Sequence, residues 1–265
     1  MNELLVFRLF APFASWGEVA VGEVRPSAIR PTRSALLGLL AAALGLDRGN
    51  DDAHAALAAG TRLAVRLDQP GVALTDYHTI NWRRPRREVV LTRADELRAP
   101  RHELSTIQSR RYYRCDSAAT VAVAEHGEPR WPLAALAAAL ERPVFPLYLG
   151  RKACPPALPL APEIVQAASL AEAFRLYDRR RPLPASISRH KPRADSAELS
   201  WDADLGVDPG EEATAAQIVE RRDEPLSRRR WRFSERREAV AEISMSGPST
   251  SSEEGHDVSE SPHPG

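Results

Sequence analysis

Apolar residues near the start of the chain follow two different periods. The run LLVFRLF at residues 4–10 is almost continuously apolar, which predicts a central β-strand that opens the fold. The run ALLGLLAAALGL at residues 35–46 predicts an apolar helix. Thr32 or Ser34 can cap its first turn, and Gly45 stands where a left-handed C-terminal cap is expected. The chain therefore begins with a strand followed by a helix.

The pattern continues to about residue 150 with the same two kinds of element. Further elements are predicted in this order: a brief helical turn at 53–59, a half-buried strand at 62–68, a strand at 118–124, a helix at 133–140 and a fourth strand at 144–149. Pro132 is suited to the first turn of the second helix. This order is that of an α+β, ferredoxin-like (RRM-like, βαββαβ) domain. Many RNA-recognition domains share that fold, although the fold alone does not establish RNA binding.

A long polar insertion, residues 76–115, separates the second and third predicted strands. It is rich in arginine and has no helical apolar stripe. Its segments VVLTR (89–93) and SRRYYRC (109–115) predict the two arms of a long β-hairpin. Tyr112 and Tyr113 stand among its arginines, and such clusters suit contacts to phosphates and stacking on bases. The alternative is a solvated charged hairpin, because most runs of charge have no other role.

The remainder of the chain divides into two parts. After a proline-rich connector, residues 164–177 predict a helix and residues 217–243 predict strands. We therefore expect a small C-terminal antiparallel β domain over residues 151–243, following the ferredoxin-like domain over 1–150. Residues 244–265 have low complexity and predict a disordered acidic tail.

The charge of the 265-residue chain is zero overall but unevenly distributed. No Lys or Arg follows Ile243, so the positive charge lies in the body of the protein. Only Lys152 and Lys191 are lysines, and arginine is the cation whose planar fork best matches phosphates. GC-rich coding also favours arginine and accounts for the ratio of Arg to Lys. The clustering of the arginines needs a separate explanation.

Several classes of protein are not indicated by the sequence. Cys115 and Cys154 are far apart without metal-ligand spacing, which predicts reduced thiols in a cytoplasmic protein. The opening residues carry no secretion signal and are too few to span a membrane. No phosphate-binding P-loop, GxSxG or dinucleotide fingerprint occurs. We therefore expect no cofactor, no metal and no catalytic residues.

Two further segments are candidates for phosphate contacts. Gly150, Arg151 and Lys152 follow a predicted strand, and a glycine beside two cations lets the backbone approach a phosphate closely. As a bare motif this also fits any turn at the end of a strand.

The segment PTRS at residues 31–34 lies at a predicted helix start, where free N–H groups favour anions. A plain helix cap and a cap with a phosphate contact fit it equally. Arg25 and Arg30 in the preceding loop can add charge, and Trp16 is either core or a stacking platform.

Five segments together resemble one known family: FRLFAPFASWGE, RPTRSALLGLLAAALGL, LTDYHTI, RRYYRCDSAATVAVA and PVFPLYLGRKACPPALPL. In order and spacing they are similar to RAMP-superfamily CRISPR proteins of the Cas-five type, in the form that belongs to subtype I-E Cascade. The resemblance covers roughly residues 3–178, continues more weakly through RDEPLSRRRWRF, and leaves out the acidic tail.

The resemblance implies a non-catalytic RNA-binding subunit that serves antiviral defence. Such a subunit binds and caps the 5′ handle of the CRISPR RNA, and its inserted hairpin, the thumb, docks on backbone subunits. The resemblance also implies that the large subunit of Cascade is a further partner, that target DNA is contacted only indirectly, and that no membrane is bound. The residues expected to contact RNA are Arg25, Arg30, Arg33, Ser34, His78, Asn81, Arg110, Arg111, Tyr112, Gly150, Arg151 and Lys152. Those expected to dock the thumb on a partner are Trp82, Arg83, Arg84, Arg86, Arg87, Arg98 and Arg101.

Two other functions remain open at this point. One is an endoribonuclease that processes CRISPR repeat RNA, with His78 or His102 as base and Tyr77 or Tyr112 assisting. We do not expect it, because no clear Lys–His pair stands in the thumb. The other is a purely protein-binding cap with incidental RNA contact.

Overall fold

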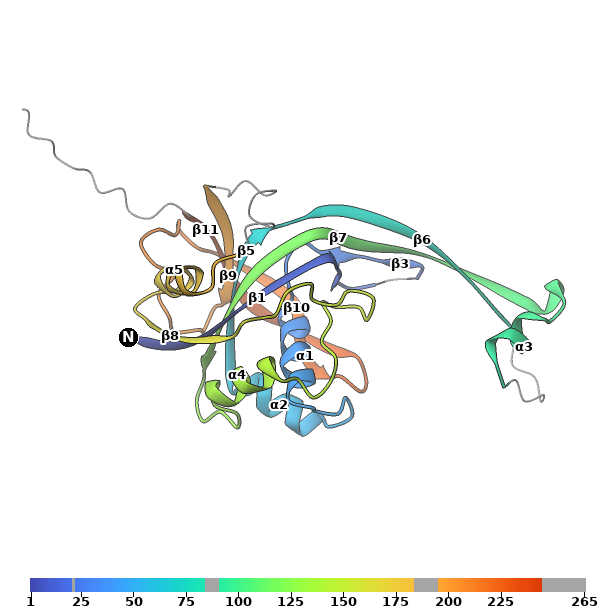
Figure 1. Cartoon of the computed structure of the whole chain (residues 1–265), viewed down its shortest axis with the longest axis horizontal. Coiled ribbons are helices and arrows are strands. Elements are labelled where there is room, and N and C mark those ends of the chain that lie inside the picture. The colour runs from blue at the N-terminus through green and yellow to red at the C-terminus, as the bar shows by residue number, and fades with distance from the viewer. Residues whose placement is uncertain (21, 84–90, 184–194, 245–265) are drawn as a thin grey trace, which may run out of the picture.

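The computed structural model describes residues 1–20, 22–83, 91–183 and 195–244. A body built on one long sheet carries a two-stranded arm that projects far from it (Figure 1). The strands are β1 Asn2–Ala14, β2 Trp16–Gly17, β3 Val24–Arg25, β4 Ser27–Ala28, β5 Thr61–Gln69, β6 Val72–Arg83, β7 Leu104–Glu125, β8 Glu163–Ala167, β9 Ser196–Asp202, β10 Gln217–Ser227 and β11 Arg232–Ser244. The helices are α1 Arg33–Ala43, α2 Asp51–Ala59, α3 Arg93–Leu97, α4 Leu133–Glu141 and α5 Leu170–Arg180, with a 3₁₀ turn at Arg101–Glu103.

The main sheet has the strand order β10-β11-β9-β5-β7-β1-β8, and neighbours along this path are antiparallel. Its segment β8-β1-β7-β5 places the fourth, first, third and second strands of the ferredoxin-like unit side by side, with α1 and α4 as the crossover helices. The predicted α+β ferredoxin-like fold is therefore confirmed.

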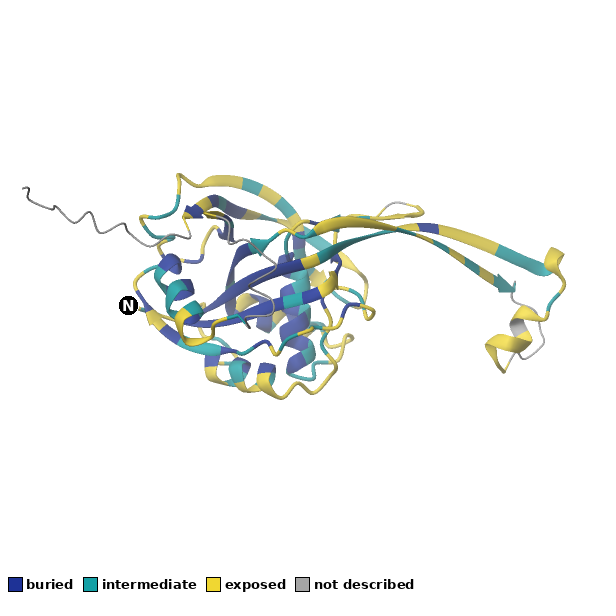
Figure 2. Cartoon of the chain, turned by 45° about the horizontal axis from the view of Figure 1, so that its top comes forward, coloured by how far each residue is buried: buried dark blue, intermediate teal, exposed yellow. Residues whose placement is uncertain are grey.

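Helices cover both faces of the sheet, which explains the nearly continuous apolar run of β1. Leu5, Phe7 and Leu9 pack into the core beneath α1, α2 and α4. Leu4 and Val6 point to the opposite face, into the core beneath α5. Both cores are fully closed to solvent, as Figure 2 shows for the body (dark blue).

The hairpin exists, but its pairing differs from the prediction. The segment 109–115 pairs with 72–78, from Val72 opposite Cys115 to His78 opposite Ser109, and not with 89–93. Residues 89 and 90 lie outside the described ranges, and α3 begins at Arg93. The error has a physical cause: both faces of the arm meet solvent, so the segment 72–83 lacks the apolar alternation that marks a strand.

The fourth strand also lies elsewhere than predicted. Residues 144–149 form no strand, because Val144 and Phe145 donate their backbone N–H groups to the last carbonyls of α1, those of Ala43 and Ala42 (3.0 and 3.1 Å). β8 takes that place instead, beyond the predicted boundary at residue 150. The helix predicted from residue 164 begins only at Leu170.

The C-terminal strands are antiparallel as predicted, and they continue the sheet of the body. β9 pairs with β5, with Trp201 opposite Ala64, and β11 and β10 follow outward. Cys115 and Cys154 are both free thiols, as predicted.

Tyr177 of α5 is fully buried and donates its hydroxyl to the carbonyls of Leu160 and Ala161 (3.2 and 3.0 Å). Burial raises the pKa of Tyr177 to about 12. The folded state therefore keeps the phenol proton up to a higher pH than the unfolded state does. Its contribution is complete below about pH 10, the ordinary tyrosine pKa, and is lost as the pH rises through 12.

We predict that the free energy of unfolding falls by up to roughly 3 kcal/mol between pH 10 and pH 12, and that Tyr177→Phe removes this decline. Urea unfolding at a series of pH values measures it. Tyr148→Phe, at an exposed phenol, is the matched control and should keep the decline. If the unfolding free energy of the wild type and of Tyr177→Phe falls equally with pH, the decline does not come from Tyr177.

Candidate nucleic-acid interface at the base of the hairpin

The arm leaves the body where three chain segments meet around β7. β3 adds to β7 in parallel, with Val24 opposite Arg110 and Arg25 opposite Arg111. The Arg110 N–H donates to the carbonyl of Glu23 (3.0 Å). The short β3 thus brings a cation from the N-terminal loop beside the arginines of β7.

The loop that contains Gly150 closes the same region from another side. The Ser15 N–H donates to the carbonyl of Leu149 (3.0 Å). Gly150 has φ +88°, and a Cβ on it would lie 1.7 Å from the Ser15 carbonyl oxygen. Only glycine allows the two backbones to approach this closely. The glycine predicted to approach a phosphate is therefore explained by its contact with the protein's own backbone.

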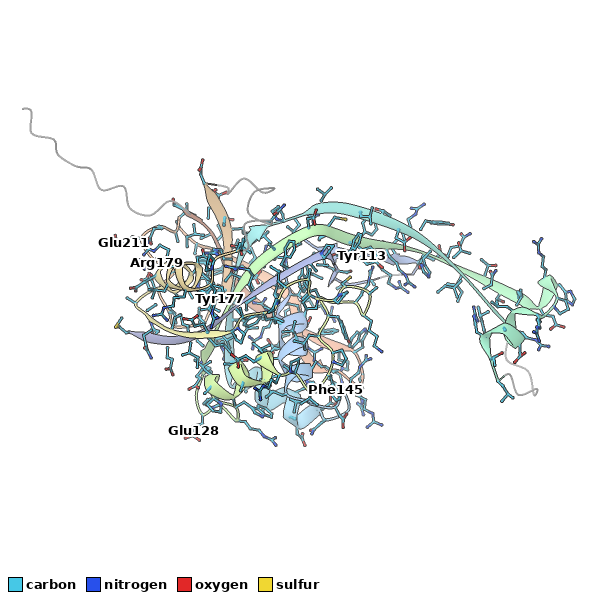
Figure 3. The ribbon with its side chains drawn as sticks, viewed as in Figure 1. Tyr113, Glu128, Phe145, Tyr177, Arg179 and Glu211 are labelled. Atoms are coloured by element: carbon cyan, nitrogen blue, oxygen red, sulfur yellow. The ribbon has the colours of Figure 1, made fainter. Side chains whose placement is uncertain are left out.

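Arg151 ties the loop to the hairpin. Its guanidinium lies over the Tyr113 ring, 4.6 Å from the centroid, and donates to the Arg25 carbonyl (3.2 Å). Its Nη1 is buried and has no hydrogen-bond acceptor among the described residues. Phe13 packs edge-to-face with Tyr113, with the ring centroids 6.2 Å apart. Figure 3 shows Tyr113 at the junction of body and arm.

The two faces of β7 separate the remaining side chains as the strand period predicts. Arg110 and Tyr112 point to one face, and Arg111 and Tyr113 to the other. Across the pair, Tyr77 stands opposite Arg110. We call the following set the hairpin base: Arg25, Arg110, Arg111, Tyr112, Tyr113, Gly150, Arg151 and Lys152.

The hairpin base carries positive charge that the described residues do not neutralise. Arg110 and Lys152 are exposed and lie within ion-pair distance of no described carboxylate. Within the described ranges, the Arg111 side chain donates only to the Ser109 hydroxyl (3.3 Å). Arginines with free donors beside aromatic rings are the groups that hold phosphates and stack on bases. Seven of the predicted RNA-contact residues thus come together here.

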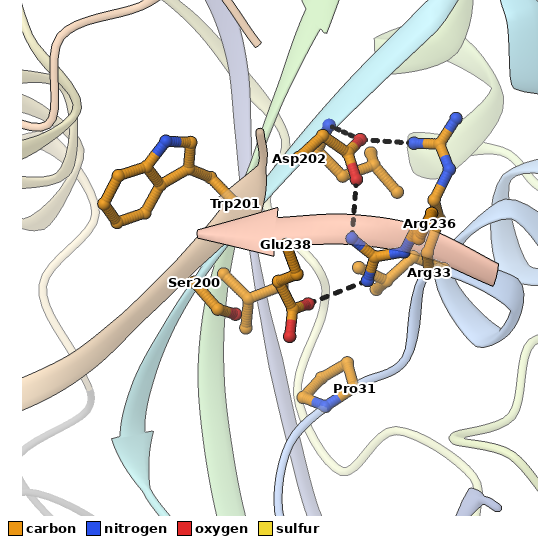
Figure 4. A pocket seen from close by; sticks show the side chains of 10 residues that line it. Pro31, Arg33, Ser200, Trp201, Asp202, Arg236 and Glu238 are labelled. Atoms are coloured by element: carbon orange, nitrogen blue, oxygen red, sulfur yellow. Dashed lines mark hydrogen bonds and ion pairs between the residues drawn. The ribbon is translucent and has the colours of Figure 1, made fainter. Parts of the chain in front are cut away.

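Arg33 must be withdrawn from the predicted set. Its side chain is only 4% exposed and pairs with Asp202 and Glu224. The backbone N–H of Arg33 donates to Asp223 (2.8 Å), and Thr32 caps α1 through the Ala35 N–H (3.3 Å). The free N–H groups predicted to attract a phosphate are therefore occupied by the protein's own carboxylate and hydroxyl. Figure 4 shows Arg33 and Arg236 both bonded to Asp202.

Arg30 and Ser34 belong to the same interior arrangement. Arg30 pairs with Glu198 and Glu238 (2.6 and 2.5 Å) and is 11% exposed. The Ser34 hydroxyl lies 3.2 Å from the Thr32 hydroxyl. Arg30 is occupied by internal carboxylates and the Ser34 hydroxyl by that of Thr32, so both residues are explained without a ligand and are withdrawn.

His78 and Asn81 lie farther out on the arm. The His78 Nδ1 is 3.4 Å from the Asp76 carboxylate, and His78 stands opposite Ser109, next to the hairpin base. The Asn81 side chain accepts a hydrogen bond from the Thr106 hydroxyl (2.8 Å).

The described members of the predicted docking set, Trp82, Arg83, Arg98 and Arg101, lie toward the end of the arm. The Trp82 indole N–H is buried without an acceptor in the part of the chain that the structure describes. Arg83 pairs with Glu103 (3.1 Å), and Arg98, which is mostly exposed, pairs with Asp95 (3.4 Å). Arg101 is exposed in the 3₁₀ turn. Arg84, Arg86 and Arg87 lie outside the described residues.

The family model described as CRISPR-associated protein (Cas_Cas5) matches residues 4–238. The chain belongs to this family. Among relatives of known name, the CRISPR system Cascade subunit CasD of Escherichia coli (strain K12) is 35% identical over 186 residues, covering 67% of this chain and 78% of that protein. The resemblance noted from the sequence is thereby confirmed.

Solved structures of this kind also match in fold. A chain of a structure titled "CRISPR RNA-guided surveillance complex" aligns with a TM-score of 0.60 and 29% identity, covering 93% of this chain and 95% of that one. A second structure, titled "Crystal structure of Cas protein", aligns with a TM-score of 0.55 and 26% identity, covering 91% of this chain and 95% of that one. The fold of this Cas5 family member therefore resembles that of both solved chains along nearly its whole length.

Two general properties of this family member complete the description. Within the described ranges, every helix is too short or too polar to cross a membrane. The same ranges contain no group of three or more His, Cys, Asp or Glu side chains placed to hold a metal ion.

Sequence reasoning on this Cas5 chain missed the roles of Phe13 and Tyr113. Phe13 was not singled out from the sequence, and Tyr113 was considered only as one of two aromatic residues among the arginines of the insertion. The contact of Arg151 with Tyr113 joins positions that are distant in sequence, so no local sequence pattern predicts it.

We predict that Gly150→Ala destabilises the protein by about 2–4 kcal/mol, because the new Cβ overlaps the Ser15 carbonyl and the residue has positive φ. Gly127→Ala is the control: Gly127 also has positive φ but open space around it, and should cost only about 1 kcal/mol. Thermal or urea unfolding compares them, and equal losses would show that the close approach to Ser15 is unimportant.

Proposed function

We propose that the chain is a non-catalytic subunit of a Cascade-type CRISPR surveillance complex. In this proposal the hairpin base binds and caps the 5′ handle of the CRISPR RNA, and the outer arm docks on the backbone subunits. Its family and its 35% identity to a protein named as a Cascade subunit support the assignment.

The main support for RNA binding is the unneutralised positive charge at the hairpin base. No described carboxylate lies within ion-pair distance of Arg110, Arg111 or Lys152, whereas Arg30 and Arg33 bond to internal carboxylates. An RNA backbone supplies the oxygens that free guanidinium groups bind, and an aromatic side chain on the same face, as Tyr112 is to Arg110, offers a stacking surface. His78 adjoins this set and is retained as a contact.

Docking of the arm rests on the apolar surface it exposes. Tyr77, Ile107 and Leu97 are 58%, 51% and 44% exposed on an arm that has no core behind it (Figure 2). A two-stranded hairpin is marginally stable alone, and a partner that covers these side chains would stabilise it. The arginines and Trp82 near its end would then meet the same partner.

No observation favours the endoribonuclease. His78 pairs with Ser109, whereas His102 lies seven positions before Ser109, toward the end of the arm. The nearest carboxylates are Asp76 for His78 and Glu103 for His102, at 3.4 and 3.9 Å. The two histidines therefore do not form a common site, and cleavage becomes an outcome of the test.

We predict that Arg110→Ala with Arg111→Ala weakens binding of handle-bearing RNA by about tenfold or more. The slope of log K against log salt should also become shallower by about 1–2, because each lost phosphate contact removes about one unit. Native gels at several salt concentrations measure both, and a denaturing gel beside them detects cleavage.

Arg142→Ala with Arg179→Ala is the matched control, because it removes two exposed arginines away from the hairpin base. An equal loss of RNA affinity in the control would show that the effect comes from the overall charge of the protein and not from the hairpin base. Cleavage at one repeat position, lost with His78→Ala, would replace the proposed capping role with a nuclease.

We predict that Ile107→Glu abolishes co-purification with the backbone subunits and leaves handle-RNA affinity within about twofold of wild type. A buried charge would oppose docking, while the hairpin base stays intact. Ile218→Glu, at a similarly exposed isoleucine of β10, is the control. Normal assembly of Ile107→Glu would contradict docking through this face.

A further inference from the structure

A second basic and aromatic group lies at the opposite end of the sheet from the hairpin. β11 and β5 both pair antiparallel with β9, so they run in the same direction. β5 ends beside the root of the arm, and β11 therefore begins at the far end. The turn that joins β10 to β11 lies at the lower edge of the body in Figure 1, whereas the arm leaves from the upper edge. We call Arg48 together with residues 228–232 the turn surface.

The turn has a fixed conformation. The Ser227 hydroxyl donates to Asp51 at the start of α2 (2.9 Å) and accepts a hydrogen bond from the Arg230 N–H (3.1 Å). Arg48 donates through Nε to the carbonyl of Arg228 (3.0 Å). The loop after α1 and the start of α2 therefore both hold it in place.

Trp231 is displayed at the tip of this turn. It is 61% exposed and has φ +56°, a left-handed conformation that is unfavourable for a bulky side chain. The Arg48 guanidinium lies 4.2 Å from the ring centroid, and Phe233 packs edge-on at 5.8 Å. Backbone strain that presents a large aromatic ring to solvent is typical of a contact residue.

Arg228 is a half-buried cation, and no carboxylate of the described residues lies within ion-pair distance of it. Its Nη2 donates to the Ser34 carbonyl, its guanidinium fills the space beside Gly38, and its Nε has no acceptor within the described residues. Burial and the neighbouring Arg48 guanidinium hold the pKa of Arg228 below its ordinary value. An anion beside this group would relieve both effects.

The contrast with the interior arginines is clear. Arg236, on the same strand β11, bonds to Asp202, Asp223 and Glu238 at 2.7–2.9 Å. In the part of the chain that the structure describes, none of the arginines of the turn surface lies within ion-pair distance of a carboxylate. Their charge therefore remains available for an outside partner.

We propose that the turn surface is a second nucleic-acid site, which binds a single strand by stacking a base on Trp231 and holding the adjacent phosphates with the exposed Arg230 and Arg232. Charge favours a polyanion, and an open indole ring favours unpaired bases, because those of a duplex are already stacked. This site goes beyond the proposed function, since it lies at the other end of the sheet from the hairpin base.

The test uses the full chain with Arg110→Ala and Arg111→Ala, so that the hairpin base contributes little. Three probes are a mixed-sequence DNA single strand, the same sequence as RNA, and the DNA duplex. In this background Trp231→Ala should weaken single-strand binding about tenfold, the effect of one lost base stack, while Trp231→Phe retains most of it. Arg230→Ala with Arg232→Ala should make the salt slope shallower by about 1–2. The stronger of the DNA and RNA arms identifies the strand.

Tryptophan fluorescence provides a readout that a merely structural role would not move. A bound single strand should quench the emission of the parent more than that of Trp231→Phe. The proposal is overturned if the Trp231, Arg230 and Arg232 variants bind both single strands as tightly as the control with Arg142→Ala and Arg179→Ala. Duplex binding that equals single-strand binding and does not depend on Trp231 would also overturn it. If the variants bind single strands normally but no longer co-purify with another subunit, the surface is a protein interface and the proposal is wrong.

Discussion

The structure depends on one strand, β7, which is both the centre of the sheet and one arm of the hairpin. Its second half, Ala118–Ala124, is buried between β1 and β5, where a slip by one residue would turn every core side chain to the wrong face. The pairing with β1 keeps this register as far as Cys115 and Arg114, past the positive φ of Asp116, and β6 and β3 pair with the strand beyond that point. Packing in the core therefore determines where the arginines of the hairpin base stand.

Arginine has two distinct uses in this protein, and the distribution of carboxylates separates them. Arg30, Arg33 and Arg236 join α1 and the preceding loop to β9–β11 through buried ion pairs, in which loss of one partner leaves an uncompensated charge. At the hairpin base and at the β10–β11 turn, no carboxylate of the described residues lies within ion-pair distance of the arginines. The zero net charge of the chain conceals this division. It explains how a neutral protein can present two surfaces suited to polyanions.

Much of the fold could be predicted because the core elements follow simple periods: LLVFRLF, the Leu- and Ala-rich helices and AATVAVA all form the elements expected. The fourth strand could not, because Val144–Leu149 is as apolar as a strand but is held against the end of α1 by backbone hydrogen bonds. Arg33 was misjudged for a related reason. Its partner Asp202 is 169 positions away, and local sequence gives no sign of such a pair. Charge and aromatic clustering did single out Arg110–Tyr113, since these residues are neighbours on one strand, whereas Arg25 and Arg151 join them only through the fold.

The most direct measurement of the central proposal is photocrosslinking of handle RNA that carries 4-thiouridine, with the crosslinked peptides identified by mass spectrometry. Binding at the hairpin base predicts crosslinks within residues 110–114 and 149–152, which are far apart in sequence but adjacent in the structure. Crosslinks confined to the start of α1, or absent from both of these segments, would contradict it.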